Sequence, residues 1–179
     1  MVVFTSPNVR WMQIVRKDNC TLYMPLWTLS ELQEAAAKFD LKRSDGSDIT
    51  ANNIEERYYA FCGVARECFL LEEDKVKEKR EDIITVVADI SSPRELEDFV
   101  RKGKNLASYH GVVHLIPEMN GRWDKPQLAS AFVVEKLGER MLQAEKVDKE
   151  SLRRSLADIP GGAAVAEWIV QAGMPCRQL

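Results

Sequence analysis

The order of apolar and polar positions near residue 25 predicts a strand followed by a capped helix. Residues 22–24 are an apolar run typical of the end of a buried strand, and Pro25 ends it. Thr28 stands three residues before Glu31, which is the spacing of a capping box at a helix start. We expect this helix to cover residues 28–39, with one buried stripe at helical spacing formed by Leu29, Leu32, Ala36 and Phe39.

The rest of the chain shows helical periodicity more often than strand alternation. Further helices are expected over residues 8–17, 53–63, 65–71, 72–90, 92–103, 129–143, 148–157 and 162–173. Strands are expected at residues 2–4, 21–24 and 112–116, and Asn120-Gly121 predicts a hairpin turn before a partner strand that Pro126 limits to a sheet edge. The pattern therefore predicts an α+β fold that is mostly helical with short strands.

One predicted helix combines a charged half with an apolar half. Residues 72–82 are almost wholly charged, and Glu73 and Lys77 stand at the i,i+4 spacing of an ion pair. We interpret this half as a solvent-facing surface, and a docking surface for a charged partner is the alternative. The buried side of the same helix is expected to consist of Ile83, Ile84, Val86, Val87 and Ile90.

Composition excludes several classes of protein. The 179 residues are 45% hydrophobic and carry a net charge of −3, which is ordinary for a globular chain and argues against a strongly basic nucleic-acid surface. No apolar run is long enough to span a bilayer, and residues 1–7 lack the pattern of a secretory signal. Cys20, Cys62, Cys68 and Cys176 form no CxxC pair, so we expect reduced thiols and no zinc site.

Sequence motifs for catalysis and cofactor binding are absent. The chain has no GxxxxGK[ST], GxGxxG, HExxH or GxSxG motif, so we expect no cofactor and no catalytic activity from this chain alone. His110 and His114 have metal-pair spacing only in a helix, and an extended chain would separate them by roughly 13 Å. Arg66 lies near two cysteines in sequence and could make a thiolate there more reactive.

Two kinds of residue are candidates for binding. Trp11, Trp27, Trp123 and Trp168 are expected to be core or corner residues, with stacking platforms as the alternative. Arg153 and Arg154 form the most basic local site. The order of the helices and the β-ribbon is also compatible with a winged-helix arrangement. With these two arginines, that arrangement makes a DNA-binding module an alternative interpretation.

Several stretches resemble the Crinkler effectors of oomycetes such as Phytophthora. They are Val3-Phe4-Thr5-Ser6-Pro7-Asn8, Leu22-Tyr23-Met24-Pro25-Leu26-Trp27-Thr28-Leu29-Ser30-Glu31-Leu32, Glu56-Arg57 and Phe61-Cys62-Gly63-Val64-Ala65-Arg66. In that family the segment follows the nucleotide-binding motifs of a P-loop ATPase. The resemblance implies that residues 1–45 supply the last strands of an ATPase-like core and residues 46–179 form a helical, winged-helix-like lid.

The resemblance also names residues and departures from the pattern. Arg57 and Arg66 are similar to nucleotide-sensing or lid-packing groups, with ordinary ion pairing as the alternative. The family pattern is close to Phe-Gly-Gly-Val-Pro-Arg, and here Cys62 replaces the first glycine and Ala65 replaces the proline.

The resemblance implies a secreted effector domain that is translocated into the host cell nucleus. There it would bind a host protein and alter immunity or cell death, with Trp27, Arg153 and Arg154 as interaction residues. Alternatives are the C-terminal lid fragment of a P-loop ATPase and the DNA-binding module. A second copy of the chain is a further candidate partner, and no membrane partner is expected.

Overall fold

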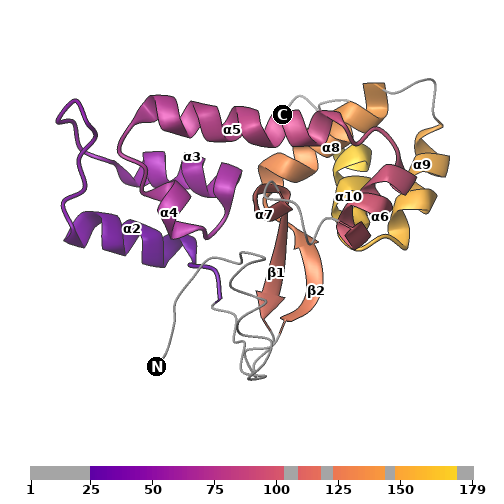
Figure 1. Ribbon diagram of the computed structural model, residues 1–179, viewed down its shortest axis with the longest axis horizontal. Coiled ribbons are helices and arrows are strands. Elements are labelled where there is room, and N and C mark those ends of the chain that lie inside the picture. Colours follow the sequence, from indigo (N-terminus) through magenta and orange to yellow (C-terminus); the bar gives the residue numbers. More distant parts are fainter. Residues whose placement is uncertain (1–24, 103–108, 118–122, 144–147, 173–179) are drawn as a thin grey trace, which may run out of the picture.

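The computed structural model describes residues 25–102, 109–117, 123–143 and 148–172 (Figure 1). The strands expected at residues 2–4 and 21–24 and the helix expected at 8–17 lie outside the described residues, as does the Asn120-Gly121 turn. The expected ATPase-like core strands therefore stay a prediction.

The described chain is mostly helical and contains one short antiparallel sheet, which confirms the expected fold class. In chain order the elements are α2 (Leu29–Lys38), α3 (Ala51–Phe61), α4 (Ala65–Cys68), α5 (Glu73–Ala88), α6 (Pro93–Lys102), α7 (Tyr109–Val112), β1 (Val113–Pro117), β2 (Trp123–Leu128), α8 (Ala131–Gln143), α9 (Lys149–Ala157) and α10 (Gly162–Ala172). Among the described residues, no helix has both the length and the apolar character needed to cross a bilayer.

The predicted capping box at the start of α2 is present, but the predicted burial of Phe39 is wrong. The Thr28 hydroxyl accepts from the Glu31 N–H, and the Glu31 carboxylate accepts from the Thr28 N–H. Phe39 is 71% exposed because the helix ends there in a Schellman-type turn. Asp40 adopts φ 47°, and the Leu41 N–H donates to the Ala36 carbonyl, so Leu41 returns to the core instead.

The next two helices also differ from the predicted bounds for identifiable reasons. Thr50 and Asn53 form a second capping box, so α3 begins two residues before the expected start at Asn53. The expected helix at residues 65–71 is shorter, because the carbonyls of Cys68 and Leu70 bond to a buried arginine side chain, Arg57, and not along a helix.

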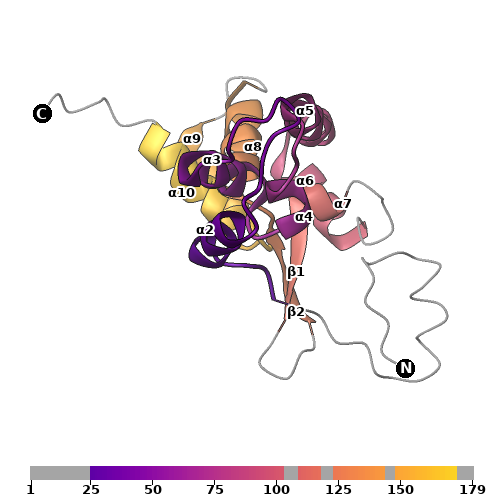
Figure 2. The same ribbon diagram turned by 90° about the vertical axis from the view of Figure 1, so that its left-hand side faces the viewer.

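The β-ribbon follows the predicted pattern with a shift of one residue. β1 and β2 pair in antiparallel register, with Val113 opposite Leu128 and Leu115 opposite Pro126. Val112 belongs to the helical turn α7 and not to the strand, and its carbonyl accepts from the Ala129 N–H. The ribbon projects away from the helices (Figures 1 and 2).

Helix α8 packs between the earlier helices of the described chain and its last helix. It contacts α3 and α5 on one side and α10 on the other, while α9 packs against α10 and α6 (Figure 1). One hydrophobic core includes Leu32 and Ala36 before the predicted domain boundary at residue 45 and Ile54 and Ile169 after it. In α5, Val76, Ile83 and Val87 are buried, whereas the expected Ile84 and Val86 are only half-buried.

The helix pair α8 and α10 approaches closely at one glycine. A Cβ atom on Gly138 would lie 2.2 Å from the ring of Trp168, so only glycine leaves room for that indole. Trp168 packs against the core, as the sequence predicts. Trp11 and the side chain of Trp123 lie outside the described residues.

Candidate interaction site

Trp27 forms a corner that closes on the loop after α3. Its backbone N–H donates to the Gly63 carbonyl at 3.0 Å, and its ring meets the Phe69 ring edge-to-face with centroids 6.1 Å apart. The residue is still 39% exposed. Trp27 is therefore a corner residue that also presents part of its surface to solvent.

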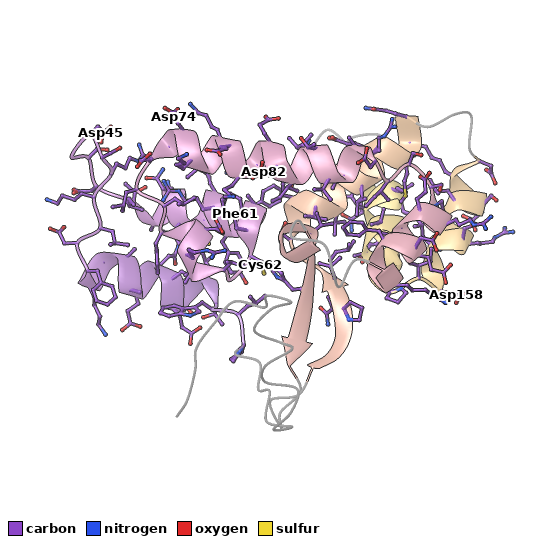
Figure 3. All side chains as sticks on the ribbon, in the orientation of Figure 1. Asp45, Phe61, Cys62, Asp74, Asp82 and Asp158 are labelled. Carbon is purple, nitrogen blue, oxygen red and sulfur yellow. The ribbon has the colours of Figure 1, made fainter. Side chains whose placement is uncertain are left out.

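The loop after α3 has little room for side chains at the point where it meets Trp27. A Cβ on Gly63 would lie 2.1 Å from the Trp27 carbonyl oxygen. Beside it, Cys62 adopts φ 52° and ψ −141°, a region that favours glycine and strains other residues. Phe61 and Cys62 lie at the end of α3 beneath α5, whereas Asp74 lies on the outer side of α5 (Figure 3).

Arg57 and Arg66 do not come together at one site. Arg57 is 2% exposed on the inner face of α3, where its Nη1 donates to the carbonyls of Cys68 at 3.1 Å and Leu70 at 2.6 Å. Its Nη2 donates to Glu73 at 3.1 Å. Arg66 is an exposed side chain that pairs with Glu67 at 3.0 Å. Both arginines make ordinary ion pairs, and nucleotide binding by them stays a prediction.

The thiol of Cys68 is free and buried, which fits the expected reduced thiol and does not favour the alternative of an activated thiolate. Burial raises its pKa to about 12, and the smaller opposing effect comes from Arg57 and not from Arg66. The Cys68 Sγ donates to the Cys62 carbonyl at 3.2 Å. At neutral pH the Cys68 side chain is a protonated, buried thiol, which is a poor nucleophile.

The charged half of α5 does not form the expected Glu73–Lys77 pair. Lys77 pairs with Asp74 at 3.5 Å, and Glu73 turns toward Arg57. The remaining charges of this half are mostly exposed, with short pairs such as Lys75–Glu78 at 2.8 Å. The charged side chains of this segment mainly form a solvent-facing surface, while Val76 is buried and Glu73 pairs with the buried Arg57.

Arg153 and Arg154 share a carboxylate on α9. The guanidinium of Arg153 lies 2.7 Å from Glu150, and that of Arg154 lies 3.5 Å from it. Glu150 thus offsets part of the charge that a nucleic-acid phosphate would meet. DNA binding at this site, like the winged-helix arrangement, stays a prediction.

The two histidines are not arranged as an extended pair. Residues 109–112 form the helical turn α7, so the strand begins only three residues after His110, and His114 is buried within β1. In the described parts of the chain, no three His, Cys, Asp or Glu side chains form a cluster suited to a metal ion.

An open hollow of about 520 Å³ lies where α3, α5 and α8 meet. Its lining is formed by Glu55, Glu56, Tyr59, Arg80, Phe132 and Glu135, a set we call the α3–α8 hollow. The rings of Tyr59 and Phe132 have centroids 6.2 Å apart and planes at 70°. Tyr59 is 42% exposed, which is high for an aromatic side chain beside a core helix.

Hydrogen bonds hold the aromatic pair in place. The Tyr59 hydroxyl donates to the Glu135 carboxylate, and burial together with this bond raises the pKa of Tyr59 to about 12. Lys136 pairs with Glu135 at 2.9 Å and with Glu139 at 2.8 Å, and its Nζ lies 5.6 Å from the centroid of the Phe132 ring. Lys136 and then Tyr59 lower the pKa of Glu135.

Unlike Glu135 and Glu139, two carboxylates at the rim have no ion-pair partner among the described side chains. They belong to Glu55 and Glu56, both exposed on α3. Arg80 lines the α5 side, and its Nη2 donates to the backbone carbonyl of Glu56 at 3.1 Å, leaving the Glu56 carboxylate unpaired. The α3–α8 hollow therefore combines an aromatic wall with an excess of negative charge.

Sequence reasoning missed this hollow because its two walls lie far apart in the chain. Tyr59 and Glu135 are 76 residues apart, and no local pattern places α3 beside α8. One signal was available on α3 itself: Glu55 and Tyr59 stand at i,i+4 spacing, on the side of the helix away from Ile54 and Phe61.

No family model, curated protein or solved structure shows significant similarity to this chain.

Proposed function

We propose that this chain is a protein-interaction domain of an effector resembling the Crinkler proteins. It binds a host protein and thereby alters host immunity or cell death, and it acts in the host nucleus. The observation that carries this proposal is the α3–α8 hollow, with its exposed Tyr59 and the unpaired carboxylates of Glu55 and Glu56.

The composition of the hollow supports binding to a protein surface. Tyrosine is enriched at protein interfaces and among the residues that dominate binding energy, because it offers a large rigid ring and a polar end. Here Glu135 fixes the hydroxyl of Tyr59, so the ring is held in one orientation before any partner arrives. An ordered aromatic side chain loses little conformational freedom on binding.

The host partner and the nuclear site of action rest on the resemblance. One contact supports treating the motif stretches as a single unit: Trp27, from the tryptophan stretch, donates its N–H to Gly63, from the Phe61–Arg66 stretch. Residue 62 also has the backbone conformation that glycine favours, and glycine is what the family pattern has at that position.

The test compares proteins retained from a host nuclear extract by the immobilised chain and by two variants. Tyr59→Ala removes the exposed ring, whereas Glu167→Gln changes an exposed carboxylate on α10 and serves as the control. Circular dichroism first checks that both variants are folded. We expect at least one host protein to be retained by the wild type and the control and lost with Tyr59→Ala. Identical retention by all three proteins would contradict the proposal.

A further inference from the structure

We propose that the α3–α8 hollow receives an arginine side chain from a basic segment of the partner. This inference deepens the proposed function and rests on it, because it names the chemistry of the group that the hollow recognises. The aromatic wall, a cation that the chain already holds beside that wall, and the charge at the rim support it.

The wall itself already holds a cation supplied by the chain. The ammonium of Lys136 lies over the Phe132 ring at 5.6 Å and pairs with the carboxylates of Glu135 and Glu139. This arrangement of an aromatic face flanked by carboxylates is the environment that attracts a cation through the ring quadrupole. The neighbouring ring, Tyr59, belongs to the same wall but has no cation over it among the described side chains.

The rim supplies negative charge next to the unoccupied ring. Glu55 precedes Tyr59 by one helical turn, and Glu56 lies on the Arg80 side of the hollow. Glu135 is already paired with Lys136, so the two unpaired carboxylates of Glu55 and Glu56 stand against one guanidinium, that of Arg80, and the rim is complementary to a cationic group. Arg80 opposes such a group, and this gives the proposal a variant with the opposite expected sign.

Arginine fits this wall better than lysine does. Its guanidinium is planar, stacks on an aromatic face, is weakly hydrated and can donate two parallel hydrogen bonds to a carboxylate. A compact ammonium keeps its water more tightly and has no flat face to stack on Tyr59. The volume of about 520 Å³ accommodates a long side chain, while its open form suits a segment that lies across the surface.

The test measures binding of short glycine–serine peptides to the full chain by NMR titration. One peptide has a central arginine, a second has citrulline, which has the same shape without the charge, and a third has lysine. We expect the arginine peptide to bind about tenfold more tightly than the citrulline peptide, which corresponds to about 1.4 kcal/mol. Equal binding of arginine and citrulline, or tighter binding of lysine than of arginine, would overturn the proposal.

Variants locate the binding to the hollow. The double change Glu55→Gln and Glu56→Gln should weaken arginine-peptide binding about five- to tenfold, and Arg80→Gln should strengthen it. Glu167→Gln removes one negative charge outside the lining of the hollow and should leave the affinity unchanged. An equal loss with Glu167→Gln would show general charge attraction and would overturn the site. A dimer of the chain that buries Tyr59 would overturn it too.

The two proposals fail in different ways. If host proteins are lost with Tyr59→Ala but the arginine peptide does not bind, the interaction function stands and the arginine inference is wrong. If the arginine peptide binds the hollow but no host protein depends on Tyr59, the arginine site exists and the proposed function is wrong.

Discussion

The two faces of α3 carry polar residues that serve different purposes. On the inner face, Arg57 is almost completely buried, and its guanidinium bonds only to protein groups. On the outer face, Glu55, Glu56 and Tyr59 are exposed and border an open hollow. The comparison teaches that burial and existing partners separate a polar residue that stabilises the fold from one that is available to a ligand.

The largest effect is expected from Arg57→Met on the inner face. Methionine fills part of the volume but leaves the buried carbonyls of Cys68 and Leu70 without a donor. We expect the free energy of unfolding to fall by about 3 kcal/mol, measured by urea denaturation.

The matched control for this change is Arg66→Met. Its guanidinium is exposed and pairs only with the neighbouring Glu67, and such surface pairs contribute little. Similar losses from both arginines would contradict the assignment of Arg57 as the structural arginine of the pair.

The next largest effect is expected at the loop that leaves α3. In Gly63→Ala the new methyl group would meet the Trp27 carbonyl oxygen, which is backbone and cannot rotate away. We expect the free energy of unfolding, measured by urea denaturation, to fall by about 2 kcal/mol. The tryptophan fluorescence of the folded variant should also differ from that of the wild type, because the surroundings of Trp27 change. Gly46→Ala provides the comparison, because a Cβ there meets no atom within 4 Å, although its positive φ adds strain. A smaller loss from Gly63→Ala than from Gly46→Ala would contradict the close packing at Trp27.

A gain in stability is expected where α3 ends. Cys62→Gly relieves a backbone conformation that costs a non-glycine residue about 1–3 kcal/mol, while glycine adds about 1 kcal/mol of chain entropy to lose on folding. The net expectation is a stabilisation of up to about 2 kcal/mol, seen as a higher urea midpoint. Cys62→Ala keeps the strained φ and should not show this gain, so equal gains from both variants would contradict the explanation.

The smallest effect on stability is expected on the outer face, from Tyr59→Phe. The pKa of Glu135 is lowered by Lys136 and by Tyr59. A carboxyl group with a lowered pKa stabilises the fold above its unfolded pKa, and this contribution is lost as the pH falls through the folded pKa. Tyr59→Phe removes one of the two causes and should make the acid-induced loss slightly smaller, by about 0.5 kcal/mol.

The pKa of Tyr59 is shifted in the opposite direction to that of Glu135. Its pKa is raised to about 12, so its stabilising contribution is complete below pH 10 and is lost as the pH rises through about 12. An absorbance titration of tyrosinate in the wild type and in Tyr59→Phe should assign a late-titrating group to this residue. A wild-type curve in which that group titrates near its ordinary pKa would contradict the bond to Glu135.

Local signals in the sequence predicted much of the fold. Capping residues such as Thr28 and Asp148 placed helix starts correctly, and Pro126 lies in the short two-stranded ribbon as expected. The errors arose where one local rule competed with another. Phe39 continues the apolar spacing of α2, yet Asp40 takes the left-handed conformation that usually calls for glycine and ends the helix.

The candidate site was not predictable in the same way. The i,i+4 rule pairs Glu73 with Lys77, but the buried guanidinium of Arg57 is a stronger partner and comes from another helix. The hollow depends on Tyr59 and Glu135 meeting across two distant helices, which only tertiary packing decides. The sequence could indicate residues with binding chemistry, but not which of them the fold leaves without partners.

An NMR map of the isotopically labelled chain titrated with the arginine peptide tests whether the outer face of α3 is the binding face. We expect saturable shifts at Glu55, Tyr59 and Phe132, and none in α9 or α10. Shifts spread over exposed carboxylates throughout the chain, or centred on the Trp27 corner, would contradict the claim that the outer face of α3 is the binding face.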